Sequence, residues 1–201
     1  MRRLEFNIEN REQIFAFLKN ANYGYLNMFD ELYPYSIPMN YIFVDSKIVL
    51  HCAKNGKKID LIKKNPNVSF NVSKGLSFIP SYYTDSKNAC SATTFFKSIM
   101  IQARASFTVE LDEKAKYLKE FMEKFQPERK YKNISLEEAS YKAMLKSMNL
   151  IELEIIDISA KFKFGQNLSK EKLETILKEL KSTNGNLELI FEIENYLKDK
   201  N

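Results

Sequence analysis

The segment from residue 51 to residue 70, HCAKNGKKIDLIKKNPNVSF, holds the clearest structural signals in the chain. The spacing of its central apolar residues predicts a short helix with Ile59 and Ile62 on the inward face. Pro66 ends this helix, because proline has no N–H group to continue the hydrogen-bond ladder. A strand follows over residues 68–72, where β-branched residues alternate with others.

The first turn of this helix carries an unusual pair of charges. We expect Asn55 to cap the helix and Gly56 to open it, which places Lys57 and Lys58 in the first turn. Cations normally avoid this end, because the free N–H groups and the helix dipole already carry positive partial charge there. A bound anion would explain the pair, and phosphate is the usual one. A solvated basic turn in a lysine-rich protein is the alternative, and spacing alone does not separate the two.

On either side of this segment, apolar runs with a two-residue period predict antiparallel strands joined by short turns. The runs cover residues 23–29, 35–44, 48–53, 95–109 and 150–158. Pro38 lies inside the second run and indicates an edge or a bulge, because it cannot donate to a neighbouring strand. The stretch 73–94 has serines, Gly75 and Pro80, and we expect it to form a long loop.

Helical periodicity appears at both ends of the chain and between the strands. We expect helices over residues 10–21, from a cap at Asp112 to Phe125, from a Ser135–Glu138 capping box to near Met148, and as a hairpin over 169–181 and 187–198. The charged stripes after Asp112 are interpreted as solvated helix faces. Strands and helices do not alternate regularly, so the pattern predicts an α+β fold rather than a doubly wound sheet.

Composition argues against several classes of partner. The 31 basic and 26 acidic side chains give a net charge of +5, but the lysines are mixed with glutamates and no RNA-binding motif is present. We therefore expect no nucleic-acid partner. No apolar run has membrane-spanning length and no secretory leader is recognisable, so we expect no membrane association. Two cysteines and one histidine are too few for a zinc site, and a reducing cytoplasm is the expected location.

Four segments carry a resemblance to a known family. They are PYSIPMNYIF (34–43), IVLHCAKNGKKIDLIKKNPNVSF (48–70), FFKSIMIQARASF (95–107) and AKFKFGQNLSKEKL (160–173). The first three, in this order, resemble the FMN-binding split barrels of the pyridoxamine 5'-phosphate oxidase-like group, closest to the nitroimidazole-resistance (Nim-type) flavin reductases. The fourth resembles a Lys-x-Lys-x-x-Gln-Asn stretch that ends the barrel in related flavin-binding regulators.

The resemblance implies an antiparallel six-stranded Greek-key split β-barrel with peripheral helices. The barrel would span residues 1–160. Residues 161–201 would form a C-terminal helical extension that packs on the barrel or on a partner subunit. The resemblance further implies a homodimer with one FMN in each of two clefts at the interface.

The same resemblance implies a set of cofactor-binding residues. Lys57 and Lys58 would hold the FMN phosphate, and Lys163 with its neighbours would reach the cofactor from the partner subunit. The full implied set is Pro38, Met39, Asn40, Tyr41, His51, Cys52, Ala53, Lys57, Lys58, Ser98, Ile99, Lys163, Gln166 and Asn167. The chain departs from the family at residues 96–105, where a usual tyrosine and a usual glycine are replaced by Phe96 and Ala103. This departure leaves the substrate open.

His51 is the only histidine, and it follows an apolar run in an expected strand. Such a residue is commonly a satisfied core histidine. Next to a cofactor, its imidazole would instead be a catalytic group that donates to substrate or flavin and titrates near neutral pH.

The function expected from the resemblance is that of an FMN-binding oxidoreductase, which reduces a small aromatic or nitro compound with electrons from NAD(P)H. The sequence has no dinucleotide fingerprint, so the nicotinamide would bind transiently over the flavin. Two alternatives remain: a non-catalytic flavin-binding sensor or regulatory protein, and a haem-binding split barrel with His51 as an axial ligand.

Overall fold

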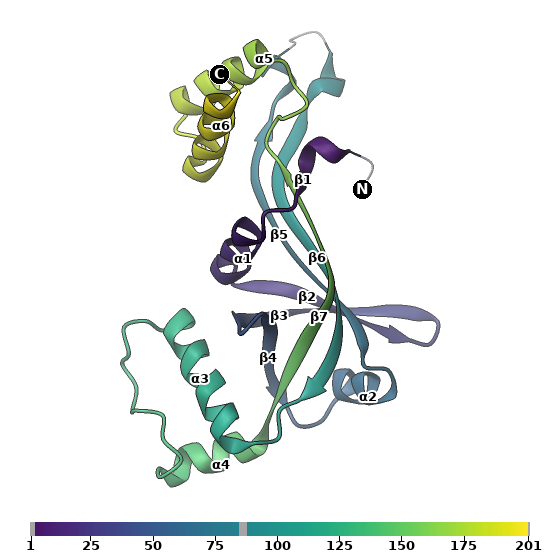
Figure 1. Cartoon of the computed structure of the whole chain (residues 1–201), viewed down its shortest axis with the longest axis vertical. Coiled ribbons are helices and arrows are strands. Elements are labelled where there is room, and N and C mark those ends of the chain that lie inside the picture. Colours follow the sequence, from purple (N-terminus) through teal and green to yellow (C-terminus); the bar gives the residue numbers. More distant parts are fainter. Residues whose placement is uncertain (1–2, 85–87, 201) are drawn as a thin grey trace. The chain divides into compact units, whose positions relative to one another are not determined.

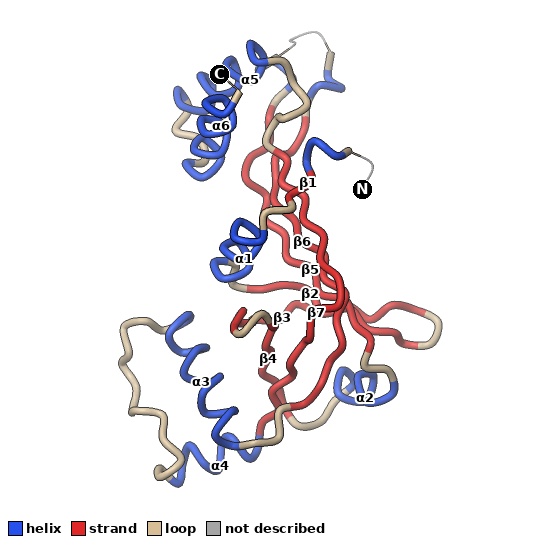
Figure 2. The backbone as a smooth tube through the Cα atoms, in the orientation of Figure 1, coloured by secondary structure: helices blue, strands red, loops and turns tan. Residues whose placement is uncertain are grey.

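The computed structural model describes residues 3–84 and 88–200 and is drawn in Figures 1 and 2. The strands are β1 (Asn7–Ile8), β2 (Tyr23–Asp30), β3 (Tyr33–Val44), β4 (Lys47–Ala53), β5 (Asn67–Ile79), β6 (Thr93–Phe107) and β7 (Met148–Lys163). The α-helices are α1 (Arg11–Asn20), α2 (Lys57–Lys64), α3 (Leu111–Phe125), α4 (Ala139–Ser147), α5 (Lys170–Ser182) and α6 (Leu187–Asp199). Three short 3-10 turns complete the described elements: η1 (Leu4–Phe6), η2 (Ser81–Tyr83) and η3 (Ala89–Ser91).

Six strands close a ring in the order β7-β4-β3-β2-β5-β6, because β6 also pairs with β7. The short β1 adds to β7 outside this ring. The β2–β3, β2–β5, β3–β4 and β4–β7 pairs are all antiparallel. The α+β class and the six-stranded split barrel expected from the sequence are confirmed.

Strand β3 changes partner along its length. Residues 33–40 pair with β2, whereas the pairing with β4 begins at Tyr41. Pro38 therefore lies in a part of β3 that, among the described pairings, has a neighbour on one side only. Its lack of an N–H group costs nothing at such an edge, and the predicted edge position is confirmed.

The contacts group the chain into two units. The central unit comprises residues 11–72 and 100–158, and the terminal unit comprises residues 1–10, 73–99 and 159–201. Strands β5, β6 and β7 run from one unit into the other. The predicted division at residue 160 stays a prediction.

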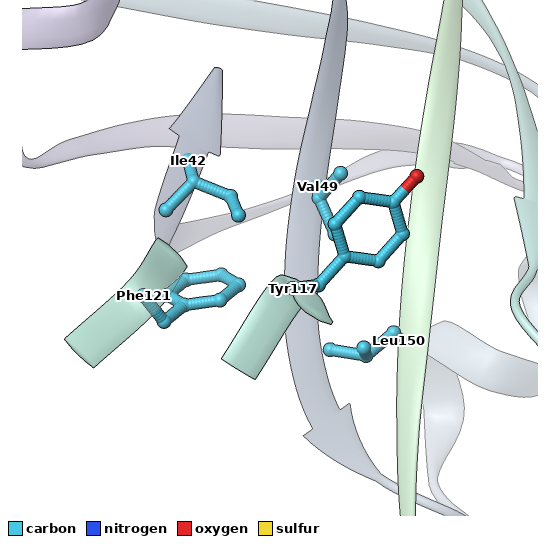
Figure 3. Packing of buried hydrophobic residues seen from close by; sticks show 5 residues of the cluster. All are labelled: Ile42, Val49, Tyr117, Phe121 and Leu150. Atoms are coloured by element: carbon cyan, nitrogen blue, oxygen red, sulfur yellow. The ribbon is translucent and has the colours of Figure 1, made fainter. Parts of the chain in front are cut away.

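In the central unit, α3 packs on the sheet. Tyr117 and Phe121, one helical turn apart, lie against Ile42, Val49 and Leu150 from three strands, as Figure 3 shows. All five side chains are buried, and each fully buried apolar side chain contributes about 1.5–3 kcal/mol relative to exposure. This cluster fixes α3 beside β4, the strand that carries His51.

In the terminal unit, α5 and α6 lie side by side as the expected hairpin (Figure 1). Their apolar stripes are buried, and Lys97 of β6 is buried with them. The Lys97 ammonium lies 2.8 Å from a Glu188 oxygen and 2.6 Å from a Glu192 oxygen. This pairing ties α6 to the strand and offsets the cost of burying the charge.

Several local expectations are wrong. The loop expected over 73–94 is shorter, because β5 continues to Ile79 and β6 begins at Thr93. The last strand is longer than 150–158, and it extends to Lys163. Buried side chains such as Leu76 and Ile79 keep the segment after residue 72 on the sheet, and its serines and Gly75 do not break it.

The expected helix caps also differ from the structure. The N-cap of α2 is Gly56 rather than Asn55, and that of α3 is Glu110 rather than Asp112. No capping box forms at Ser135, because α4 begins only after Glu138. Sequence patterns place a helix start within a few residues, whereas the cap depends on the direction in which the chain enters.

The helix faces after residue 112 are not all solvated, as the charged stripes suggested. Lys114 is buried, and its ammonium donates to the carbonyls of Leu145 and Met148 at 3.4 and 3.0 Å. Lys124 is partly buried and also donates to main-chain carbonyls. Buried lysines satisfied by carbonyls have the same sequence pattern as exposed ones.

Candidate functional site: the start of helix α2

The start of α2 is open. Gly56 has a φ of +125°, a conformation that other residues rarely adopt, and no atom lies within 4 Å of where its Cβ would be. No side chain caps the helix at this end. The positive end of α2 therefore faces free space, with Lys57 and Lys58 as its first two residues.

Lys57 lies on the exposed side of this turn. Its ammonium is 2.6 Å from an Asp30 oxygen and 4.8 Å from the centroid of the Tyr35 ring. The hydrogen bond to Asp30 raises the pKa of Lys57, so the side chain stays charged. A ligand anion at this place would share Lys57 with the Asp30 carboxylate.

Lys58 turns toward β3 and β4 and is half-buried. Its ammonium lies 3.5 Å from the Met39 sulfur. Its charge also reaches His51 and Cys52, since it lowers the pKa of both groups. Lys58 therefore joins Met39, His51 and Cys52 into one cluster of expected cofactor residues.

The His51 ring lies edge to face with Phe121, with 4.9 Å between the ring centroids. Burial lowers the pKa of His51, and the Lys58 charge lowers it further. The imidazole is therefore neutral at pH 7 and can both donate and accept a hydrogen bond. Burial raises the pKa of Cys52 more than Lys58 lowers it, so this thiol stays protonated and is a poor nucleophile.

The remaining expected residues of the central unit surround this cluster. Pro38, Met39 and Asn40 lie on the one-sided part of β3, and Tyr41 is fully buried next to them. The Tyr41 hydroxyl donates to the Leu18 carbonyl at 2.7 Å, so this side chain has a packing role. Ala53 is exposed at the end of β4, just before the turn to α2.

The expected residues after residue 97 lie in the terminal unit. Ile99 is fully buried, and Ser98 is half-buried beside it on β6. The Lys163 ammonium donates a hydrogen bond to the Thr93 hydroxyl, and burial lowers the pKa of Lys163. Asn167 is exposed.

Gln166 has a structural task. Its side-chain oxygen accepts from the Phe164 N–H at 2.9 Å, and its amide donates to the Phe162 carbonyl at 2.7 Å. The residue is buried, and its carbonyl accepts from the Tyr196 hydroxyl of α6 at 3.1 Å. Gln166 thus holds the turn between β7 and α5 and joins it to α6.

Sequence reasoning missed Asp30, Tyr35 and Phe121 as neighbours of the site. Asp30 and Tyr35 sit on the two strands of one hairpin, and Phe121 comes from a helix far along the chain. A local pattern carries no signal for such contacts.

Comparison with known proteins shows to which family this chain belongs. The family model described as pyridoxamine 5'-phosphate oxidase matches residues 10–162, well over half of the chain. The chain belongs to the pyridoxamine 5'-phosphate oxidase family. The predicted family is thereby confirmed. Comparison with curated proteins finds no match.

Solved structures of low sequence identity share the fold of this family member. A candidate 5-nitroimidazole antibiotic resistance protein from Bacteroides thetaiotaomicron is 20% identical with a TM-score of 0.63, over 77% of this chain and 85% of that one. The flavocytochrome Anf3 from Azotobacter vinelandii is 16% identical with a TM-score of 0.67, over 84% and 75%. The FAD and heme binding protein from Mycobacterium smegmatis is 14% identical with a TM-score of 0.68, over 84% and 79%.

Within residues 3–84 and 88–200, no group of three or more His, Cys, Asp or Glu side chains is arranged to hold a metal ion. Of the helices in that same part of the chain, none is long and apolar enough to cross a membrane.

Proposed function

We propose that this protein is an FMN-binding oxidoreductase that reduces a small aromatic or nitro compound with electrons from NAD(P)H. The observation that carries the proposal is the uncapped start of α2, where Lys57 and Lys58 stand beside open space and Lys58 adjoins His51. Two ammonium groups and free N–H groups at a helix start suit a phosphate monoester. Membership of a family of flavin-binding split barrels supports FMN as the molecule that carries this phosphate.

Each part of the cluster has a task in this proposal. Lys57 and Lys58 bind the phosphate, and the open side of residues 38–40 offers backbone groups to the edge of the flavin ring. The neutral imidazole of His51 stands where it donates a hydrogen bond to substrate. The flavin, when bound, supplies the redox chemistry.

The proposal includes a homodimer, in which Lys163 and Asn167 reach the cofactor held by the partner subunit. Its support is the family resemblance of residues 160–173 together with the exposed side chain of Asn167. Analytical ultracentrifugation tests it. A stable monomer that keeps its flavin would contradict a shared cleft.

A nitro compound is the first substrate class to try. The fold shared with the candidate nitroimidazole resistance protein supports this choice, with a TM-score of 0.63. A 5-nitroimidazole and a simple nitroarene, compared under identical conditions, separate specific from general reduction.

Haem binding is the second candidate function. Two structures of similar fold are named as a flavocytochrome and as an FAD and heme binding protein. His51 favours this candidate, because it is partly exposed and its lowered pKa keeps the imidazole free to bind iron.

The absorption spectrum of the freshly purified protein tests both functions. The absorption bands of oxidised flavin support FMN, whereas a Soret band supports haem. Anaerobic NADH then separates the oxidoreductase from a flavin-binding sensor. Rapid bleaching of the flavin is expected, and a flavin that stays oxidised under these conditions contradicts turnover.

A further inference from the structure

The terminal unit holds a cavity of about 460 Å³ that is separate in sequence from the α2 site. All of its lining residues belong to the terminal unit. Its volume falls within the range of about 300–1,000 Å³ that is usual for small-molecule sites. Size alone is not evidence of a ligand. The chemistry of the lining residues indicates whether the cavity binds one.

Four cations line this cavity: Arg3, Lys161, Lys163 and Lys172. None of the described residues that line it is acidic. Burial lowers the pKa of Lys163, and the charges of Lys161 and Arg3 lower it further. Lys161 and Arg3 are therefore close enough to Lys163 for their charges to repel it.

Among the described residues, the one carboxylate that pairs with these cations does not neutralise the group. Glu5 approaches Arg3 at 3.6 Å, but both side chains are partly exposed and such surface pairs contribute only about 0–1 kcal/mol. The Lys163 ammonium donates its hydrogen bond to the Thr93 hydroxyl, which is neutral. An anion inside the cavity would relieve the repulsion among the cations.

The rest of the lining combines aromatic and aliphatic side chains with small polar ones. Phe95 and Phe96 contribute to the wall, and the Lys161 ammonium lies 5.6 Å from the Phe96 ring centroid and 5.5 Å from that of Phe6. Inorganic phosphate alone would make no apolar contact with these rings. A ligand with both an anionic group and a flat apolar body would contact both parts of the lining.

We propose that this cavity is a second ligand site, which binds a small organic anion composed of an aromatic ring and a phosphate, sulfonate or carboxylate group. Lys57 and Lys58 belong to the other unit, and neither of them lines this cavity. Lys163 and Asn167 also line the cavity. The variants that test the proposal are therefore at Lys161 and Lys172, which the proposed flavin site does not use.

Isothermal titration calorimetry with phenyl phosphate tests the site in the full-length protein. The wild type should bind the probe saturably, and phenol, which lacks the anion, should not bind. The double variant Lys161→Ala/Lys172→Ala should bind it at least tenfold more weakly, because two charge-assisted contacts are lost. Lys178→Ala on the same helix α5 and Lys142→Ala on α4 are exposed outside the cavity and should change nothing.

Parallel FMN titrations separate this site from the flavin site. The double variant should keep its FMN affinity, and Lys57→Ala/Lys58→Ala should keep its affinity for phenyl phosphate. Absence of saturable binding to the wild type, or equal binding by the double variant, overturns the proposal. Equal weakening of FMN and phenyl phosphate also overturns it, because the cavity would then belong to the flavin site. Lys172→Ala alone, at an exposed position, serves if the double variant does not fold.

Discussion

Two helix ends of opposite partial charge in the central unit carry lysines. At the start of α2, Lys57 and Lys58 stand at the positive end of the helix, with open space beyond Gly56. In the last turn of α3, Lys124 stands at the negative end of its helix. Its ammonium donates to the Ala21 carbonyl at 2.6 Å and to the Tyr41 carbonyl at 3.0 Å.

The difference separates a structural lysine from a candidate ligand-binding lysine. Lys124 obtains its acceptors from the protein itself and lies 4.4 Å from the centroid of the Tyr41 ring. Burial nevertheless lowers its pKa to about 8. Lys57 and Lys58 stand at the helix end that disfavours cations, and the one carboxylate paired with Lys57 is the partly exposed Asp30. An external anion is the proposed further partner of both lysines. The following four predictions test this contrast.

The largest effect is expected from the double variant Lys57→Ala/Lys58→Ala. FMN affinity should fall by more than tenfold, since each charge-assisted bond contributes about 1.5–3 kcal/mol. Flavin fluorescence titration measures the loss. The matched control is Lys63→Ala/Lys64→Ala at the other end of α2, where both side chains are exposed and FMN affinity should hold. Unchanged FMN affinity in Lys57→Ala/Lys58→Ala would show that the FMN phosphate does not bind at the start of α2.

Lys124→Met should change how stability depends on pH. The folded pKa of about 8 lies below the value of 10.5 taken for an exposed lysine, so the unfolded chain binds more protons between these values. The contribution of Lys124 to the free energy of unfolding is therefore largest above pH 10.5. This contribution is lost as the pH falls through 8. Relative to the variant, the wild type should gain about 2 kcal/mol in free energy of unfolding from pH ~8 to pH ~10.

Urea unfolding at several pH values measures this difference. Lys119→Met, exposed on the same helix, should follow the wild type at every pH. Parallel curves for wild type and Lys124→Met would mean that Lys124 is solvated and not buried.

Asp30→Asn should strengthen FMN binding by roughly 1.5- to 5-fold. The substitution releases Lys57 from a partly exposed ion pair, and such pairs contribute about 0.2–1 kcal/mol. Asp45→Asn, which breaks the exposed pair with Lys116 in another turn, is the control. Weaker FMN binding by Asp30→Asn would show that the carboxylate orients Lys57 for the ligand.

The smallest effect concerns His51 and its neighbour. Lys58→Met should raise the pKa of His51, because the variant removes the charge that helps to lower it. The chain has one histidine, so its imidazole signals in an NMR titration need no further assignment. Lys54→Met removes a charge three residues from His51 and serves as the comparison. An unchanged His51 titration in Lys58→Met would separate Lys58 from the proposed cluster.

Much of the fold could be predicted from the sequence, because it depends on local periodicity. The helix at 57–64 and the strands around it were expected within a few residues, since Gly56 and Pro66 act on their own neighbours. The β5–β6 region was misjudged, because small polar residues weaken the strand pattern even where the sheet continues. Packing on neighbouring strands overrides such local preferences.

The candidate site could be predicted only in part. The lysine pair and the single histidine are visible in the sequence, and the family resemblance connects them. The ion pair of Lys57 with Asp30 joins residues 27 positions apart, and the contact of His51 with Phe121 joins residues 70 apart. The cavity of the terminal unit likewise combines the N-terminus with residues beyond 160.

By itself the sequence determined where the helices and strands lie and that two lysines begin α2, because these features depend on neighbouring residues. Only the tertiary structure decided which lysines are buried, which have carboxylate partners and which line a cavity. The physical reason is that the free energy of a charge depends on its solvent and its counter-charges. Both are set by residues that meet through the fold and not along the chain.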